Sequence, residues 1–306
     1  MSVTNGIVLI DKPSGITSFN VVSRIKRMFN TKKVGHAGTL DPLATGLLPI
    51  LINKATKVQE LIQNADKEYI AEFCLGLTTD TQDITGSITN KYDGVINVSK
   101  KELNNVLLSF KGAIQQTPPM YSAISKNGVR LYNLARRGVE VKREKRNVKI
   151  NRLELLDFDN LNKTGKILVN CSKGTYIRTL CADIGEQLGC GATLTNLRRT
   201  KTCNFSIDES ISLDTLENLK KSGKENAAII SLEKVFNYYR VVFWGLEQEK
   251  MFRNGRKFNI SLDINDVLSL NSKECLLKVF NKDNIFLGLG KYSFENRIFS
   301  VYKLLV

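Results

Sequence analysis

The sequence contains a single histidine, His36, and six cysteines that never lie within two residues of each other. Zinc and non-haem iron centres usually draw on several histidines or on paired cysteines, so this composition argues against a metal site. The lack of a CxxC motif also argues against zinc knuckles and dithiol redox chemistry, and it indicates cysteines that stay reduced. We therefore expect neither a metal enzyme nor a thiol oxidoreductase.

Long apolar runs are also missing. The longest, 47–52, includes Pro49 and is far shorter than the ~18 residues that a membrane span requires. Residues 1–15 lack the basic start and long apolar core of a signal peptide. The sequence predicts a cytoplasmic protein without membrane association.

Motifs for nucleotide cofactors are absent as well. No GxxxxGK[ST] occurs, and the nearest approach to GxGxxG, at 288–291, falls at the end of an expected strand. Nucleotide hydrolysis and dinucleotide redox reactions are therefore disfavoured, and no cofactor is expected.

Positive charge, by contrast, is abundant and localised. The 306 residues carry 45 Lys and Arg against 30 Asp and Glu, a formal net charge of +15. More than half of this excess falls in 126–152, where ten cations face two acids, and smaller basic runs lie at 11–33 and 198–201. One such run is usually a solvated face, but three runs joined by tyrosines favour a polyphosphate partner. RNA or DNA is the leading partner class.

The expected elements mix strands and helices without regular alternation, which favours an α+β fold on a mixed or antiparallel sheet. The residue patterns predict strands at 6–10, 67–76, 148–158 and 166–171. They predict helices after a cap at Thr17 or Ser18, at 54–63, after the Ser99–Glu102 capping box, and from Thr175 to a Gly189 cap. The glycine- and proline-rich stretch 31–49 predicts a loop.

The character of the chain changes after about residue 236. Short apolar segments separated by turn residues predict strands at 239–243, 267–270, 275–280, 285–289 and 297–305. A small β-barrel accounts for this pattern. The sequence therefore predicts two domains, 1–235 and 236–306.

The segment GHAGTLDPLATG at 35–46 is the strongest candidate for chemistry. It places the one histidine five residues before Asp41, whose backbone is held extended by Pro42. An isolated Asp-Pro usually begins a turn. The flanking glycines and the histidine weaken that interpretation without overturning it.

This segment resembles motif II of the pseudouridine synthases, in the form typical of the TruB family, the tRNA pseudouridine-55 synthases. Five further blocks of that family occur in order over about two hundred residues: DKPSG (11–15), KEYIA (67–71), PPMYSA (118–123), KGTYIR (173–178) and LTNLRRT (194–200). The terminal segment resembles a PUA domain in its strand pattern and in FLGLG (286–290). The resemblance implies a pseudouridine synthase catalytic domain, a basic arm inserted at 118–146 with a helix at 129–137, and a PUA-like barrel.

Carried over residue by residue, the resemblance makes Asp41 the catalytic carboxylate and Arg178 its partner. Tyr69 would pack on the target base and is the candidate to take its C5 proton. The expected substrate-binding residues are His36, which helps displace the base from its stack, Leu197 as a pocket wall, Lys12 and Pro13 at the pocket floor, and Tyr176. The arm would bind the RNA backbone through Lys126, Arg130, Arg136, Arg137, Lys142 and Arg143.

The implied activity is isomerisation of uridine to pseudouridine at position 55 in the T loop of tRNA, with no cofactor, metal, protein partner or guide RNA. A non-catalytic tRNA-binding chaperone is the alternative, although a binder has no use for an acid facing an anionic ligand. A guide-RNA-dependent relative is disfavoured by the insert at 118–138. Attack by the carboxylate at C1′ and at C6 of the base both remain open.

Overall fold

The computed structural model describes residues 5–126, 128–262 and 273–306, and its main feature is a nine-stranded sheet. Every described strand pair in this sheet is antiparallel except β3–β12. The sheet order, followed by the two strands that pair off this path, is β1 (Gly6–Lys12), β3 (Thr45–Ile52), β12 (Ala192–Thr202), β4 (Lys67–Leu75), β11 (Thr164–Cys171), β10 (Arg146–Asp159), β7 (Gly112–Gln116), with β2 (Val34–His36) on β3 and β13 (Phe205–Ser206) on β12. The expected α+β fold on a mixed sheet is confirmed.

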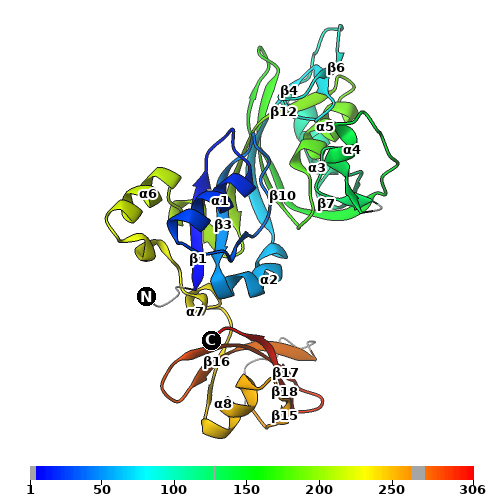
Figure 1. Ribbon diagram of the computed structural model, residues 1–306. Helices are drawn as coiled ribbons and strands as arrows, with labels where there is room; N and C mark the ends of the chain where they lie inside the picture. Colours follow the sequence, from blue (N-terminus) through cyan, green and yellow to red (C-terminus); the bar gives the residue numbers. More distant parts are fainter. Residues whose placement is uncertain (1–4, 127, 263–272) are drawn as a thin grey trace.

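Helices cover both faces of this sheet (Figure 1). One face packs against α1 (Ser18–Met28), α3 (Lys100–Ser109), α5 (Ile177–Gln187) and α6 (Leu213–Lys221). The other face packs against a 3₁₀ turn (Asn53–Val58), α2 (Gln59–Gln63) and α7 (Leu232–Val235). The Thr17 cap, the Ser99–Glu102 capping box and the left-handed Gly189 are all present. None of the helices within the described residues has both the length and the apolar character needed to cross a membrane.

Several expected boundaries were wrong. The stretch 31–49 is not one loop, because β2 and the first half of β3 lie within it. Gly46 is a strand residue at φ +102, and a Cβ there would lie 2.3 Å from the Arg199 carbonyl oxygen, so close strand packing accounts for the glycine. The helix expected at 54–63 is a 3₁₀ turn followed by α2, and the helix expected from Thr175 begins at Ile177.

A second, five-stranded sheet forms the C-terminal part of the chain, below the large sheet in Figure 1. Its order is β14 (Val241–Trp244), β16 (Glu274–Asn281), β17 (Phe286–Ser293), β18 (Ile298–Leu304) and β15 (Phe258–Asn259). The sequence did not predict α8 (Leu246–Arg253), and the strand expected at 267–270 lies outside the described residues. Leu289 and Leu305 join a cluster with Ile7 and Phe236, which attaches this sheet to the first.

The chain between β7 and β10 forms a small irregular unit. It holds a hairpin of β8 (Ser125–Lys126) and β9 (Val129–Arg130), followed by the short helix α4 (Leu131–Ala135). The helix expected at 129–137 is thus only five residues long, because Val129 and Arg130 pair with the preceding strand. A separate hairpin of β5 (Leu77–Thr79) and β6 (Ile88–Lys91) follows β4, and 3₁₀ turns lie at Ile207–Glu209 and Glu225–Ala228.

Candidate active site

A row of side chains crosses five strands on the sheet face that carries α1 and α5. The pairing register places Lys12, Gly46, Arg199, Tyr69 and Val169 side by side on β1, β3, β12, β4 and β11. Directly paired residues point to the same face of a sheet. The sheet therefore brings Lys12, Arg199 and Tyr69 together from segments that are far apart in the sequence.

Asp41 lies on the loop between β2 and β3, and the turn after β1 holds that loop in place. The Lys12 ammonium donates to the carbonyl oxygens of Pro13 and Ile16, each at 2.8 Å, and to that of Pro42 at 3.4 Å. The Gly15 amide also donates to the Pro42 carbonyl, at 2.9 Å. The residue after Asp41 is thus fixed from two sides. Pro13 is exposed, and it contributes its carbonyl rather than its ring.

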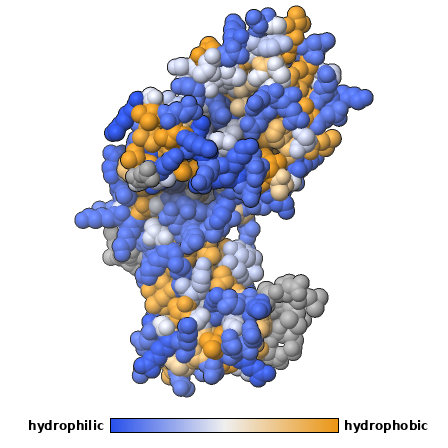
Figure 2. All heavy atoms as spheres, turned by 90° about the vertical axis from the view of Figure 1, so that its right-hand side faces the viewer, coloured by the Kyte–Doolittle hydropathy of each residue, from blue (hydrophilic) through white to orange (hydrophobic). Residues whose placement is uncertain are grey.

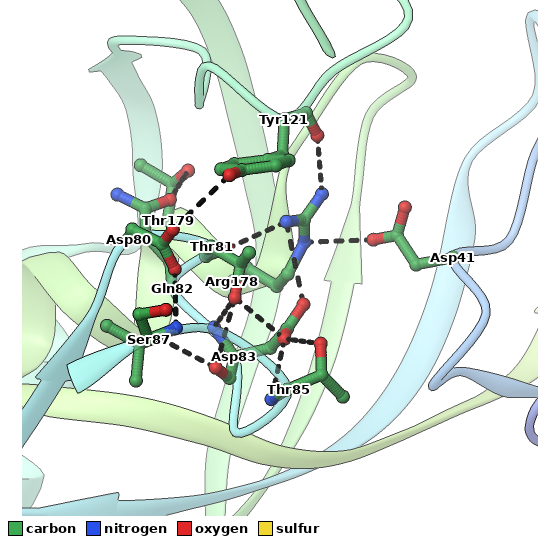
Figure 3. A network of polar contacts seen from close by, with 11 residues as sticks. Asp41, Asp80, Thr81, Gln82, Asp83, Thr85, Ser87, Tyr121, Arg178 and Thr179 are labelled. Atoms are coloured by element: carbon green, nitrogen blue, oxygen red, sulfur yellow. Dashed lines mark hydrogen bonds and ion pairs between the residues drawn. The ribbon is translucent and has the colours of Figure 1, made fainter. Parts of the chain in front are cut away.

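The guanidinium of Arg178, at the start of α5, reaches Asp41 (Figure 3). Its Nε lies 2.9 Å from Asp41 Oδ2, its Nη1 donates to the Thr81 carbonyl at 2.7 Å, and its Nη2 donates to the Tyr121 carbonyl at 3.0 Å. The Arg178 side chain is only 6% exposed, whereas that of Asp41 is 39% exposed. The arrangement leaves Asp41 accessible to a ligand and its cation inaccessible.

A second carboxylate, which the sequence did not reveal, faces the same guanidinium. Asp83 Oδ2 lies 3.6 Å from Arg178 Nη1, and the Asp83 side chain is 7% exposed. Its Oδ1 accepts hydrogen bonds from the Thr81 hydroxyl and from both the amide and the hydroxyl of Thr85 (Figure 3). Asp83 therefore fixes Arg178 in the orientation that meets Asp41. Only the folded hairpin after β4 brings it there, so sequence spacing carried no signal.

Tyr69 and Arg199 are cross-strand neighbours in the middle of the row. Burial raises the pKa of the Tyr69 phenol, and the adjacent Arg199 guanidinium opposes that rise. Arg199 is 1% exposed; its Nε donates to the Leu47 carbonyl at 2.7 Å and its Nη2 to the Gly38 carbonyl at 3.0 Å. A neutral phenol beside a fixed cation lies at the centre of the site.

Arg199 was grouped with a surface basic run in the sequence, and that interpretation was wrong. The alternation of strand residues separates it from Arg198, which points to the other face and forms a bidentate pair with Asp11 at 2.8 and 3.1 Å. Arg199 lies two residues after Leu197, and strand residues at this spacing point to the same face. That spacing is the sequence signal that could have shown Arg199 to point inward. Leu197 is buried on the same strand.

Burial shifts the pKa of the titratable groups around Arg199 toward their neutral forms. Burial lowers the pKa of Lys12 to about 8, with Arg199 adding to this and Asp41 opposing it. Burial and Arg199 also lower the pKa of His36, and His36 Nδ1 is a buried atom without a hydrogen-bond partner within the described structure. His36 is therefore a neutral ring at neutral pH, on β2 opposite Ile50.

Tyr176 caps α5 through its backbone, and a second unexpected residue holds it there. Gln116, at the end of β7, is 1% exposed. Its side chain accepts from the Tyr176 amide at 3.0 Å and donates to the Tyr176 carbonyl at 3.2 Å. This amide pairing fixes the backbone two residues before Arg178, which links the base of the 118–146 segment to the Asp41–Arg178 ion pair.

The six cations expected to bind RNA lie apart from this row. Five of them, Lys126, Arg130, Arg136, Arg137 and Lys142, are exposed, and Arg143 is half-buried. Arg143 contacts Glu140 at 2.9 Å and the Pro118 carbonyl at 3.3 Å, so it also stabilises the segment itself. Hydrophilic residues cover most of the face in Figure 2, and apolar residues gather there in separate patches.

The arrangement offers the Asp41 carboxylate with two sets of fixed cations near it, Arg178 in one and Lys12 with Arg199 in the other. The neutral phenol of Tyr69 lies close to this carboxylate. Within residues 5–126, 128–262 and 273–306 no group of three His, Cys, Asp or Glu side chains is placed to hold a metal ion. The chemistry that these residues can supply is nucleophilic or electrostatic stabilisation of a developing positive charge by Asp41.

Comparison with known proteins points to one family. The model of the TruB family pseudouridylate synthase N-terminal domain matches residues 26–177, and that of the tRNA pseudouridylate synthase B C-terminal domain matches 178–237. The tRNA pseudouridine synthase B of Clostridium tetani is 45% identical over 304 residues, covering 99% of this chain and 100% of its own. That of Francisella tularensis is 46% identical over 246 residues, 80% of each chain.

Solved structures show the same fold over almost the whole chain. A chain of a Cbf5–Nop10–Gar1 complex superimposes with a TM-score of 0.71 at 26% identity, covering 98% of this chain and 85% of that one. A chain of an archaeal box H/ACA Nop10–Cbf5 complex gives a TM-score of 0.70 at 25% identity, covering 99% and 87%. The similarity therefore includes both sheets.

Proposed function

The chain belongs to the TruB family of pseudouridylate synthases and is a TruB-type tRNA pseudouridine synthase, and we propose that its target is the uridine at position 55 in the T loop of tRNA. Asp41 is the carboxylate that we assign to the chemistry. The observation that carries this assignment is the 2.9 Å contact between the accessible Asp41 and the buried Arg178. A guanidinium at this distance pairs with the carboxylate and fixes its orientation in the site.

The reaction conserves every atom of the uridine. The N1–C1′ bond breaks, a C5–C1′ bond forms, C5 loses a proton and N1 gains one, with no change in oxidation state. Asp41 either attacks or electrostatically stabilises the sugar at C1′, or adds to C6 of the base, and both routes use the same accessible carboxylate. No step needs a cofactor, an external oxidant or an energy source.

The neighbours of Asp41 take the roles for which their protonation suits them. Tyr69 is buried and its raised pKa keeps the phenol protonated, which favours packing against the base over accepting the C5 proton. His36 is neutral and carries an unpartnered Nδ1, which suits it to replace the base in its stack. Such contacts offset the few kcal/mol that unstacking a nucleotide costs.

RNA binding is assigned to the exposed arm at 118–146 and to the PUA-like domain at 236–306, with the catalytic domain at 1–235. Fixed cations on the arm would release counterions from the RNA backbone. The solved neighbours are complexes of Cbf5 with other proteins, whereas this chain spans the full length of the Clostridium tetani enzyme. We therefore propose that the enzyme works in the cytoplasm without a protein partner or guide RNA.

A T-arm hairpin RNA tests this function. The purified protein alone should produce one carbodiimide-dependent primer stop, at the T-loop uridine, and none when that uridine is replaced by cytidine. Addition of a chelator should not change the yield. A protein that binds this hairpin without modifying it would instead match the tRNA chaperone. Modification at scattered uridines would contradict the T-loop assignment.

A further inference from the structure

The segment that connects Lys12 to Asp41 carries uncompensated positive charge. Residues 12–40 contain six cations and no acidic residue. Lys12 is buried against backbone carbonyls, which leaves five for the outer surface: Arg24, Lys26, Arg27, Lys32 and Lys33. No ion pair joins any of the five to an acid within the described part of the chain. The proposed arm does not account for this charge.

Helix α1 presents most of that charge on the side opposite the core. Val21 and Ile25 are buried in the core. Phe19, Ser23 and Arg27 recur every four residues, so they follow one line along the outer side of the helix. Arg27 is exposed and lies about 12 Å from Phe19 along the helix axis. Arg24, one turn before Arg27, lies beside this line.

Phe19 is an apolar residue for which the fold has no evident use. Its side chain is 70% exposed on the first turn of α1. The Thr17–Asn20 capping box holds this turn, so the ring projects from a fixed backbone. An exposed aromatic ring beside basic residues is typical of surfaces that stack nucleic-acid bases.

The same turn of α1 is bonded to the catalytic loop. Ser18 Oγ donates to the Leu40 carbonyl at 3.1 Å and accepts from the Leu40 amide at 2.9 Å. Phe19 follows Ser18 in the chain, and Asp41 follows Leu40. The Ser18–Leu40 contact therefore ties the backbone next to Phe19 to the backbone next to the catalytic carboxylate. Asp41 contacts Arg178, which in turn donates to the Tyr121 carbonyl near the base of the arm. α1 and the arm therefore connect to Asp41 through separate contacts.

We propose that the outer side of α1 is a second RNA-binding surface, in which Phe19 stacks on an unpaired T-loop base near the target uridine and Arg24 and Arg27 bind the phosphates beyond it. This inference rests on the proposed function in taking T-arm RNA as the ligand. A polyanion matches a helix side with three cations and no acid, and an unpaired base matches an exposed aromatic ring. The surface would hold the RNA strand through contacts separate from those of the arm.

Affinity measured against salt concentration separates the two kinds of contact. Phe19→Ala should raise the Kd for T-arm RNA by roughly five-fold to a hundred-fold, because one base stack is lost, and should leave the salt slope unchanged. Phe19→Tyr should restore binding. Arg24→Gln with Arg27→Gln should flatten the slope of log affinity against log salt by about 1.4 to 1.8, the value for two phosphate contacts.

Matched controls come from exposed residues far from α1 in the sequence. Leu161→Ala removes a side chain that is 88% exposed, and Lys91→Gln with Lys101→Gln removes two exposed cations. Both should keep wild-type affinity and salt slope. Melting temperatures of all variants should stay close to the wild type, because every substituted side chain lies on the surface or at its margin.

A scan of abasic sites through the T loop identifies the stacked base. In the wild type one abasic position besides the target should weaken binding, and Phe19→Ala should abolish the penalty at that position alone. Equal penalties in both proteins at every position would overturn the stacking assignment. Unchanged RNA affinity and salt slope in the α1 variants would overturn the second RNA-binding surface altogether. A face that binds a protein instead of RNA would give this result.

These binding measurements do not depend on turnover. If wild-type protein binds T-arm RNA but leaves its uridine unmodified, the proposed function fails while the effects of Phe19 and the arginines can still be measured. If modification proceeds and the α1 variants bind normally, only the second surface fails.

Discussion

Arg178 and the arginines of the arm carry the same guanidinium group in opposite surroundings. The Arg178 side chain is 6% exposed and contacts two carboxylates and two carbonyl oxygens. Arg136 and Arg137 are exposed, and Arg136 lies over the Tyr132 ring with its Cζ 5.7 Å from the centroid. A buried cation acts strongly on its neighbours, whereas an exposed one is screened and adds little to stability. On the proposed function, the buried cation serves the chemistry and the exposed cations serve RNA binding.

The largest effect is expected from Arg178→Lys. Lysine keeps the positive charge but cannot form the same fork of contacts to Asp41, Asp83 and the two carbonyls. We expect kcat to fall by on the order of 100-fold or more, with the Kd for T-arm RNA nearly unchanged. Single-turnover kinetics with saturating enzyme measures the first value and filter binding the second. A loss confined to affinity would place Arg178 in binding.

Substitutions in the arm should have the opposite signature. Replacing Arg136, Arg137, Lys142 and Arg143 by Gln should flatten the salt slope of RNA affinity by up to about three units, similarly for T-arm and unrelated hairpins. Turnover at saturating RNA should fall much less than affinity. An unchanged slope would show that the arm is a solvated face, and normal affinity without turnover would place it in the catalytic step.

The pKa of Lys12 predicts a pH dependence within the site itself. Burial places that pKa at about 8. Above this value the amine loses its charge and one N–H, so the contacts that hold Pro42 weaken and kcat should decline. A profile of kcat against pH should show this decline in the wild type and lose it in Lys12→Met. The same profile in both proteins would exclude Lys12 as its cause.

Stability should change with pH in the opposite direction. The folded-state pKa of Lys12 lies below its usual value of 10.5. The unfolded chain therefore binds more protons between about pH 8 and 10.5, and the Lys12 contribution to the free energy of unfolding rises through that window. Urea unfolding of wild type and Lys12→Met at about pH 7 and about pH 9.5 measures the difference. A difference that shifts against the wild type at high pH would contradict it.

The smallest effect is expected at Gln116, which links the base of the arm to the start of α5 and so to Arg178. Gln116→Met keeps the side-chain volume but leaves the backbone of Tyr176 without its two partners, which should cost about 1–3 kcal/mol of stability. We expect kcat to fall several-fold with KM unchanged, because α5 then positions Arg178 less firmly. Gln116→Glu can still accept from the Tyr176 amide and should lose less. A change in KM alone would contradict a positioning role.

The sequence predicted most of the fold where one face of an element is apolar. The strand at 67–76 and the capped helices were found because their side chains alternate or repeat toward the core, and the strand at 6–10 was found as a short apolar run that is buried on both faces. β2 and β3 were missed because glycines and a proline interrupt the apolar pattern. These two strands form by pairing with each other, and β3 also pairs with β1 and β12. Likewise α8 has few buried residues and a strongly polar sequence.

Within the site, resemblance supplied Asp41, Tyr69 and Arg178, and the structure places Asp41 and Arg178 in direct contact. It could not supply Asp83, Gln116 or the inward direction of Arg199. These three depend on which segments the sheet brings side by side. The sequence does not reveal toward which face of a sheet a charged side chain points until the pairing register of its strand is known.

The central claim is that Asp41 performs the chemistry while other residues hold the RNA. Asp41→Asn tests it most directly, because the amide keeps the shape and removes only the charge. We predict that single-turnover assays on T-arm RNA detect no pseudouridine, while the Kd stays within about two-fold of the wild type and Asp157→Asn, at an exposed aspartate, behaves normally. Pseudouridine formation by Asp41→Asn near the wild-type rate would contradict the account.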